Sequence, residues 1–68
     1  MDKKNLLKIK MLENDIKTYD ELANKLGTSR QNIYNKLKGK TKWKYSDIDK
    51  LKKMLSLTEN DISIICFN

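Results

Sequence analysis

The chain has 68 residues and a formal net charge of +6, and it contains one cysteine and no histidine. A chain of this length forms one small domain of marginal stability, because it buries only about 60% of its unfolded surface. We therefore expect no enzyme and no cofactor. The single cysteine excludes an intrachain disulfide, and together with the absence of histidine it excludes a zinc finger or another metal site.

The positive charge is concentrated in one part of the chain. Between Leu22 and Ser46 there are seven basic residues and no acidic residue, whereas the other eight basic and nine acidic residues sum to −1. Such a cluster indicates a polyanionic partner whose phosphates supply the missing charge. The seven residues are Lys25, Arg30, Lys36, Lys38, Lys40, Lys42 and Lys44.

Nothing in the sequence indicates a membrane or an export route. The chain has no run of 18 apolar residues, and its first ten residues are too charged for a secretory signal. We therefore expect a cytosolic protein, in bacterial cytosol or nucleoid. With no proline and only two glycines, the chain is expected to be all-α.

The first predicted helix covers about residues 4–13. Apolar residues occupy more than one of its faces, and Leu7 and Met11, one turn apart, are our choice for the buried side. Ile16 is expected to enter the core from the connection that follows.

The second helix is predicted over about residues 19–26. Thr18 and Glu21 form the pattern of a capping box, in which the hydroxyl and the carboxylate each accept a backbone N–H at the helix start. Leu22, Ala23 and Leu26 make one apolar ridge. Gly27 is expected to end the helix, because glycine adopts the left-handed conformation at little cost.

The third helix is predicted over about residues 29–38, with Thr28 or Ser29 as its cap. At about 100° per residue, Ile33 and Leu37 face the core. The opposite side then carries mainly amides and cations, with Tyr34 beside them. These outward residues are Arg30, Gln31, Asn32, Asn35, Lys36 and Lys38.

The remainder of the chain is expected to form a basic loop and two further helices. Gly39 opens the loop, which Trp43 and Tyr45 are expected to pack onto the domain, and Ser46 is predicted to cap the fourth helix. A fifth helix is predicted to begin at residues 58–61. Residues 62–67 fit a helix or a short strand, and Ile64 and Phe67 are left as an exposed surface for self-association.

The residues from 18 to 40 resemble the helix-turn-helix of the phage repressor and Cro family, which has the lambda-repressor-like fold. The matching residues are Leu22-Ala23, Gly27, Thr28-Ser29, Ile33 and Gly39-Lys40. The resemblance covers nearly the whole chain and implies a single five-helix DNA-binding domain over residues 1–68. Lys36 departs from the pattern, since an apolar residue is frequent there and Leu37 follows one position later, which implies a slightly rotated helix.

The resemblance also implies the partner and the roles of individual residues. It implies a small phage or mobile-element regulator that binds a double-stranded operator as a homodimer, for which the sequence itself offers the C-terminal segment as the interface. We expect no sensor domain in the 68 residues. Base contacts would come from Arg30, Gln31, Asn32 and Asn35. Phosphate contacts would come from Thr18, Tyr19, Ser29, Lys36, Lys38, Lys40, Thr41 and Lys42.

Two other functions fit the same bundle. The first is a protein-interaction adaptor, such as an antirepressor or a toxin–antitoxin component, and the second is non-specific packaging of nucleic acid. On residue type alone the amides of the third helix could also be ordinary surface side chains, and Tyr19 could simply pack in the first turn of its helix. Salt-dependent binding to duplexes of different sequence distinguishes these functions.

Overall fold

The computed structural model describes residues 2–67, and these residues form five helices and no strand. The all-α, five-helix expectation is confirmed. The strand alternative for residues 62–67 is wrong, because the last helix continues to Cys66. Residues 1 and 68 of the expected domain lie outside the described part. The helices are α1 (Lys3–Glu13), α2 (Tyr19–Leu26), α3 (Arg30–Leu37), α4 (Tyr45–Leu55) and α5 (Glu59–Cys66).

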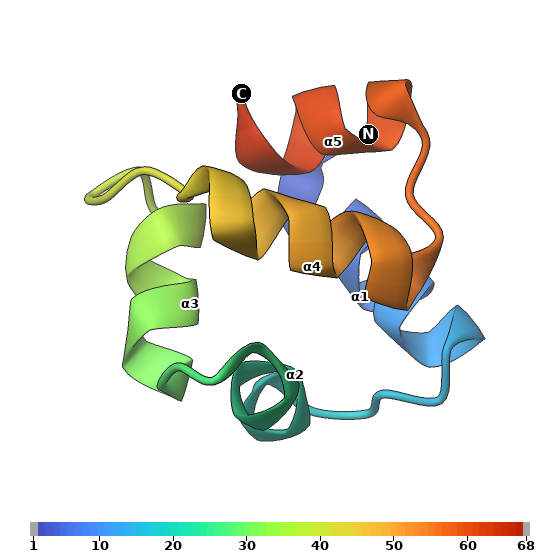
Figure 1. The fold of residues 1–68 in the computed structure, drawn as a ribbon, viewed down its shortest axis with the longest axis horizontal. Coiled ribbons are helices and arrows are strands. Elements are labelled where there is room, and N and C mark those ends of the chain that lie inside the picture. The colour runs from blue at the N-terminus through green and yellow to red at the C-terminus, as the bar shows by residue number, and fades with distance from the viewer. Residues whose placement is uncertain (1, 68) are drawn as a thin grey trace.

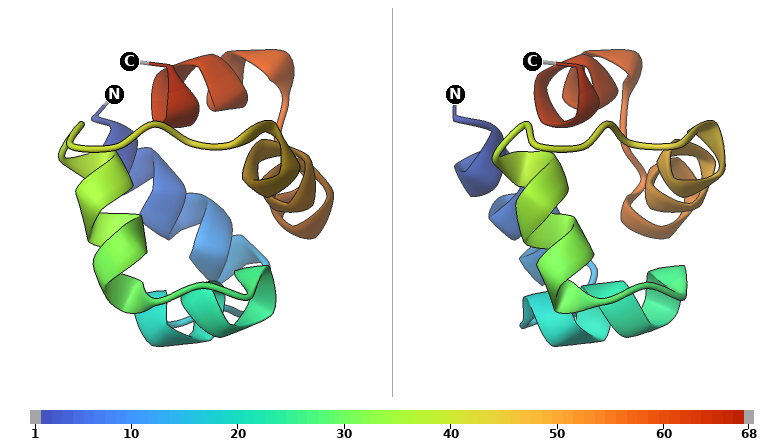
Figure 2. Two further views of the ribbon diagram at one scale, coloured as in Figure 1. Left: turned by 60° about the vertical axis from the view of Figure 1, so that its left-hand side comes forward. Right: turned by 90° about the vertical axis from the view of Figure 1, so that its left-hand side faces the viewer.

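The helices surround a shared apolar core and leave α3 at one edge of the molecule. α4 crosses the middle of the view in Figure 1, with α5 above it and α1 behind it. α2 and α3 lie roughly perpendicular to each other (Figures 1 and 2), and α3 faces the viewer in the right-hand panel of Figure 2. Each helix contributes to the core, which consists of Leu6, Leu7, Met11, Ile16, Leu22, Ala23, Leu26, Ile33, Leu37, Trp43, Leu51, Leu55, Leu57, Ile62 and Ile65.

Side-chain caps fix where most of the helices begin. Thr18 accepts the Glu21 N–H at 3.1 Å, and Thr58 forms a reciprocal capping box with Asp61. The second bond of the capping box predicted at Thr18, from the Thr18 backbone N–H to the Glu21 carboxylate, is wrong. The Glu21 carboxylate accepts the Lys17 N–H at 3.4 Å, one residue before the expected partner, because the extended chain at Thr18 brings that amide within reach.

The start of α4 differs from the prediction in two respects. Its cap position is Lys44, without a side-chain hydrogen bond, so Ser46 lies inside the first turn and is not the cap. Tyr45 was expected to pack the basic loop onto the domain, but it is 86% exposed. As the first helical residue it lies about 80–120° around the helix from Leu51 and Leu55, which make the buried stripe. Trp43 alone of the two aromatics is buried.

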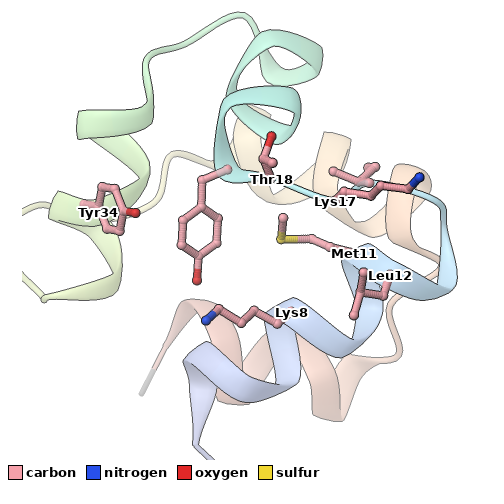
Figure 3. A pocket seen from close by; sticks show the side chains of 8 residues that line it. Lys8, Met11, Leu12, Lys17, Thr18 and Tyr34 are labelled. Carbon is pink, nitrogen blue, oxygen red and sulfur yellow. The ribbon is translucent and has the colours of Figure 1, made fainter.

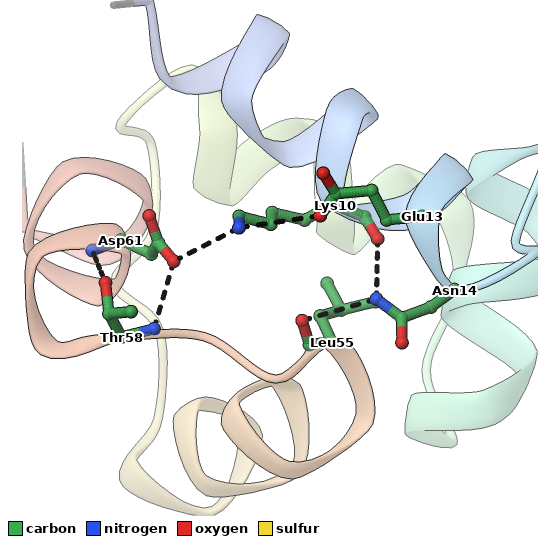
Figure 4. Close-up of polar contacts among 6 residues, drawn as sticks. All are labelled: Lys10, Glu13, Asn14, Leu55, Thr58 and Asp61. Atoms are coloured by element: carbon green, nitrogen blue, oxygen red, sulfur yellow. Dashed lines mark hydrogen bonds and ion pairs between the residues drawn. The ribbon is translucent and has the colours of Figure 1, made fainter.

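A polar cluster joins the ends of α1, α4 and α5 (Figure 4). The Asn14 amide donates to the carbonyl of Lys10 at 2.8 Å and to that of Leu55 at 3.3 Å. The Lys10 ammonium lies 3.6 Å from the buried Asp61 carboxylate. The backbone N–H of Thr58 lowers the pKa of Asp61 below its ordinary 3.8, and Lys10 lowers it further against the opposing effect of desolvation. These contacts connect helices that are distant in sequence.

Candidate nucleic-acid interface

The turn between α2 and α3 is set by glycine and by two backbone hydrogen bonds. Gly27 has φ +74°, and its N–H donates to the carbonyl of Asn24 at 3.2 Å. The next amide, of Thr28, donates to the carbonyl of Ala23 at 2.9 Å. This pair of bonds is a Schellman motif, which closes α2 and turns the chain directly into α3. Ser29 then caps α3 by accepting the Asn32 N–H at 3.2 Å.

α3 is held by two fully buried side chains and presents its other side to solvent. Ile33 and Leu37 are 0% and 1% exposed, one turn apart, as their spacing predicts. Arg30, Gln31 and Asn32 are exposed, whereas Asn35 is half-buried. In the right-hand panel of Figure 2 this helix lies in front of the others, so no other helix of the described chain covers its outward side.

The exposed amides and the arginine are already hydrogen-bonded within the protein. The Gln31 Nε2 donates to the Asn35 Oδ1 at 3.1 Å, across one turn of α3. The Asn32 Nδ2 donates to the Thr28 hydroxyl at 2.8 Å. Each amide keeps further donors and acceptors available, because a primary amide offers two N–H groups and two lone pairs. Their orientation is therefore partly fixed before any ligand binds.

A basic loop follows α3 and is folded back on it. Gly39 has φ +79°, and the Lys40 N–H donates to the carbonyl of Asn35 at 2.9 Å, which is a second Schellman closure. Trp43 is buried, and the Lys36 ammonium lies 5.9 Å from the centre of its ring, within the range of a cation–π contact. This anchor leaves polar residues of the loop exposed beside the end of α3, among them Lys38, Lys40, Thr41 and Lys42.

The start of α2 forms the other end of this surface. Tyr19 and Tyr34 make an edge-to-face pair with ring centres 5.2 Å apart, which connects α2 to α3. Burial is the main cause of the raised pKa of Tyr19. The hydroxyls of Thr18 and Ser29 accept cap N–H groups, and each still has an O–H to donate.

A cleft of about 370 Å³ lies between α1, the start of α2 and α3 (Figure 3). Met11 and Ile16 lie at its apolar side, and Lys8 and Lys17 are its cations. Neither lysine was among the residues predicted to contact DNA. Lys17 directly precedes the cap of α2, which is a signal that could have indicated it, whereas nothing in the sequence around Lys8 predicts that it lies near Thr18.

Three groups of residues therefore lie along one side of the molecule. The first is at the start of α2, the second is the outward side of α3, and the third is the basic loop. In residues 2–67 no three histidine, cysteine, aspartate or glutamate side chains are placed to hold a metal ion. No helix in the same range is long and apolar enough to cross a membrane.

This helix–turn–helix with its exposed polar helix defines a class of DNA-binding protein. A model of the Cro/C1-type helix-turn-helix DNA-binding domain matches residues 6–65, which is most of the chain. The chain belongs to this family, and the resemblance inferred from its sequence is confirmed. It is a DNA-binding protein of a family whose domains are in general not enzymes. No curated protein and no solved structure gives a significant match.

Proposed function

We propose that the chain is a sequence-specific transcriptional regulator that binds double-stranded DNA and acts in the cytosol or nucleoid, with residues 1–68 as a single domain. One observation carries the proposal. The outward side of α3 holds exposed Arg30, Gln31 and Asn32 in the middle of a chain segment without acidic residues. A helix with such side chains fits the major groove, where arginine pairs with guanine and primary amides pair with adenine.

In this proposal each group of residues has one role. Arg30, Gln31, Asn32 and Asn35 contact base edges. Phosphates are contacted by Thr18 and Tyr19 at one end of α3, and by Ser29, Lys36, Lys38, Lys40, Thr41 and Lys42 along α3 and its loop. Lys8 and Lys17 are added to the first end, because they line the cleft beside Thr18. Phosphates on both sides of the groove would then fix the position of the helix.

We also propose that the protein binds DNA as a homodimer through its C-terminal segment. Phe67 is 64% exposed and Tyr45 is 86% exposed, and both lie beside a groove between α4 and α5 that Ile48 and Ile62 also line. Charged Asp49, Lys52 and Glu59 also line this groove, and the exposed aromatic side chains at it favour an interface. A two-fold dimer predicts a pseudo-palindromic operator with half-sites about 34 Å apart, one helical turn of DNA.

A role as a small phage or mobile-element repressor is the most specific part of the proposal. Fourteen of the fifteen basic residues are lysine, which together with many asparagines and isoleucines suggests an AT-rich coding genome. A promoter fused to a reporter, assayed with and without the protein, tests whether binding represses transcription.

Selection of binding sites from random duplexes, followed by sequencing, tests the main proposal. We expect one enriched sequence motif and an affinity that falls steeply with salt. Equal affinity for the selected and random duplexes would indicate non-specific packaging of nucleic acid. Absence of any salt-dependent duplex binding would favour the protein-interaction adaptor. Band stoichiometry and sedimentation equilibrium, repeated with Phe67→Ser, report on the dimer independently.

A further inference from the structure

The only arginine of the chain is paired with an acidic residue on the neighbouring helix. The Arg30 Nη1 lies 3.5 Å from the Asp20 Oδ2, and their side chains are 58% and 70% exposed. Exposed pairs of this kind contribute little to folding stability, because water and salt screen them. An acidic residue in the first turn of α2 also suits the helix dipole, as Glu21 does, but neither effect requires the carboxylate to lie beside Arg30.

The geometry leaves the arginine available for a second partner. The guanidinium has five N–H donors in a planar fork, and the bond to Asp20 uses one of them. Two other donors suffice for the bidentate bond to a guanine edge. A carboxylate beside the guanidinium narrows its range of orientations, and less conformational entropy is then lost on binding.

The Asp20 carboxylate also affects whether Arg30 contacts a DNA phosphate instead of a base. An arginine at the start of a recognition helix can bond a phosphate in any sequence, which supplies affinity without discrimination. A negative charge next to the guanidinium repels phosphate oxygens, whereas the uncharged edge of a base is repelled much less. Asp20 thus weakens the contact of Arg30 with a phosphate more than its contact with a base edge.

We propose that Asp20 is a positioning residue that determines specificity: it holds Arg30 toward a base edge and away from the DNA backbone. This inference rests on the proposed function, since it requires that α3 reads duplex DNA. Compared with a protein that lacks this carboxylate, the chain would bind every duplex somewhat more weakly. It would prefer its operator over other sequences more strongly.

Asp20→Asn tests the proposal, and Glu21→Gln is its matched control. Both substitutions remove one negative charge from the first turn of α2, but the Glu21 carboxylate bonds the Lys17 N–H, whereas that of Asp20 bonds Arg30. We expect both variants to bind random duplexes severalfold more tightly at low salt. Thermal unfolding of each variant shows separately whether the fold is intact.

Discrimination at the base pair that Arg30 reads is the decisive measurement. That pair is located first, as the position at which Arg30→Ala loses preference. A bidentate contact gives a preference of about tenfold or more, and we expect Asp20→Asn to reduce it at least threefold while Glu21→Gln leaves it unchanged. Preferences at the other operator positions should remain the same in both variants.

Three results would overturn the inference, and they separate it from the proposed function. Equal preferences in Asp20→Asn and Glu21→Gln would show that Asp20 acts only as a charge. Loss of preference at the other operator positions in Asp20→Asn, but not in Glu21→Gln, would show that Asp20 does not act through Arg30. Failure of the unsubstituted protein to select any duplex would overturn the proposed function as well.

Discussion

The basic loop after α3 gives a quantitative prediction about salt. Lys38, Lys40 and Lys42 are exposed beside the end of α3, and Lys36 lies next to them over the Trp43 ring. Each phosphate neutralised contributes about −0.9 to the slope of log K against log salt, so these four lysines contribute about −3.6 per protomer, in addition to the contributions of Lys8 and Lys17 at the other end of the surface. Through these four contacts alone, affinity per protomer should fall about 150-fold when salt rises fourfold, from ~50 to ~200 mM.

Removing two of these contacts should halve the loop's share of the slope. The double variant Lys40→Gln and Lys42→Gln leaves two of the four cations, so the loop contributes about −1.8 instead of about −3.6, and the loss of affinity over the same change in salt becomes about 12-fold smaller. A dimer doubles both contributions. Fluorescence anisotropy of a labelled duplex, titrated at several potassium chloride concentrations, measures them. The relative preference between duplexes should not change, because lysines at phosphates carry no base information.

Lys53→Gln is the control for charge alone. Lys53 is exposed in the last turn of α4, where it pairs with Asp49 at 3.2 Å, outside the proposed surface. It should leave the slope as it is. If the loop variant kept the original slope, or if Lys53→Gln lowered it by an equal amount, the loop would not be the phosphate contact and the argument from charge clustering would fail.

Three further predictions concern the fold that positions α3. Ile33→Ala removes a fully buried side chain beneath the recognition surface, and it should lower the free energy of unfolding by about 2–5 kcal/mol in urea titrations. Gly27→Ala places a side chain at φ +74° and should cost about 1–2 kcal/mol through backbone strain, although a Cβ there meets no atom within 4 Å. The pKa of Asp61 is lowered on folding, so its contribution is present above the unfolded pKa and is lost as pH falls through the folded pKa. Asp61→Asn should therefore reduce stability at pH 7 and flatten the acid limb of the stability curve below about pH 4, and an unchanged acid limb would contradict this reason.

Local signals in the sequence were sufficient for the helix–turn–helix. The cap at Thr18, the left-handed Gly27 and the inward pair Ile33 and Leu37 each depend on residues within one or two turns. Side-chain periodicity and glycine conformation are short-range properties, so they can be recognised without knowing the rest of the fold. The outward side of α3 follows from the same periodicity.

Entry into α4 could not be predicted in this way. Ser46 has the residue type of a cap, but the burial of Trp43 fixes where the preceding loop ends, and helical geometry starts at Tyr45, two residues earlier than a cap at Ser46 predicts. The burial of one aromatic and the exposure of the other depend on which side of the loop meets the core. That choice is made by packing between elements and not by local propensity.

The sequence by itself determined the class of fold, the position of the helix–turn–helix and the acid-free cluster of cations. Only the tertiary structure decided which charges meet. The pairs Lys10 with Asp61 and Arg30 with Asp20 join different helices, as does the bond from Asn14 to Leu55. Periodicity tells which side of a helix is polar, but the partner of a polar side chain depends on how two helices are placed against each other, and that placement is settled by the whole core at once.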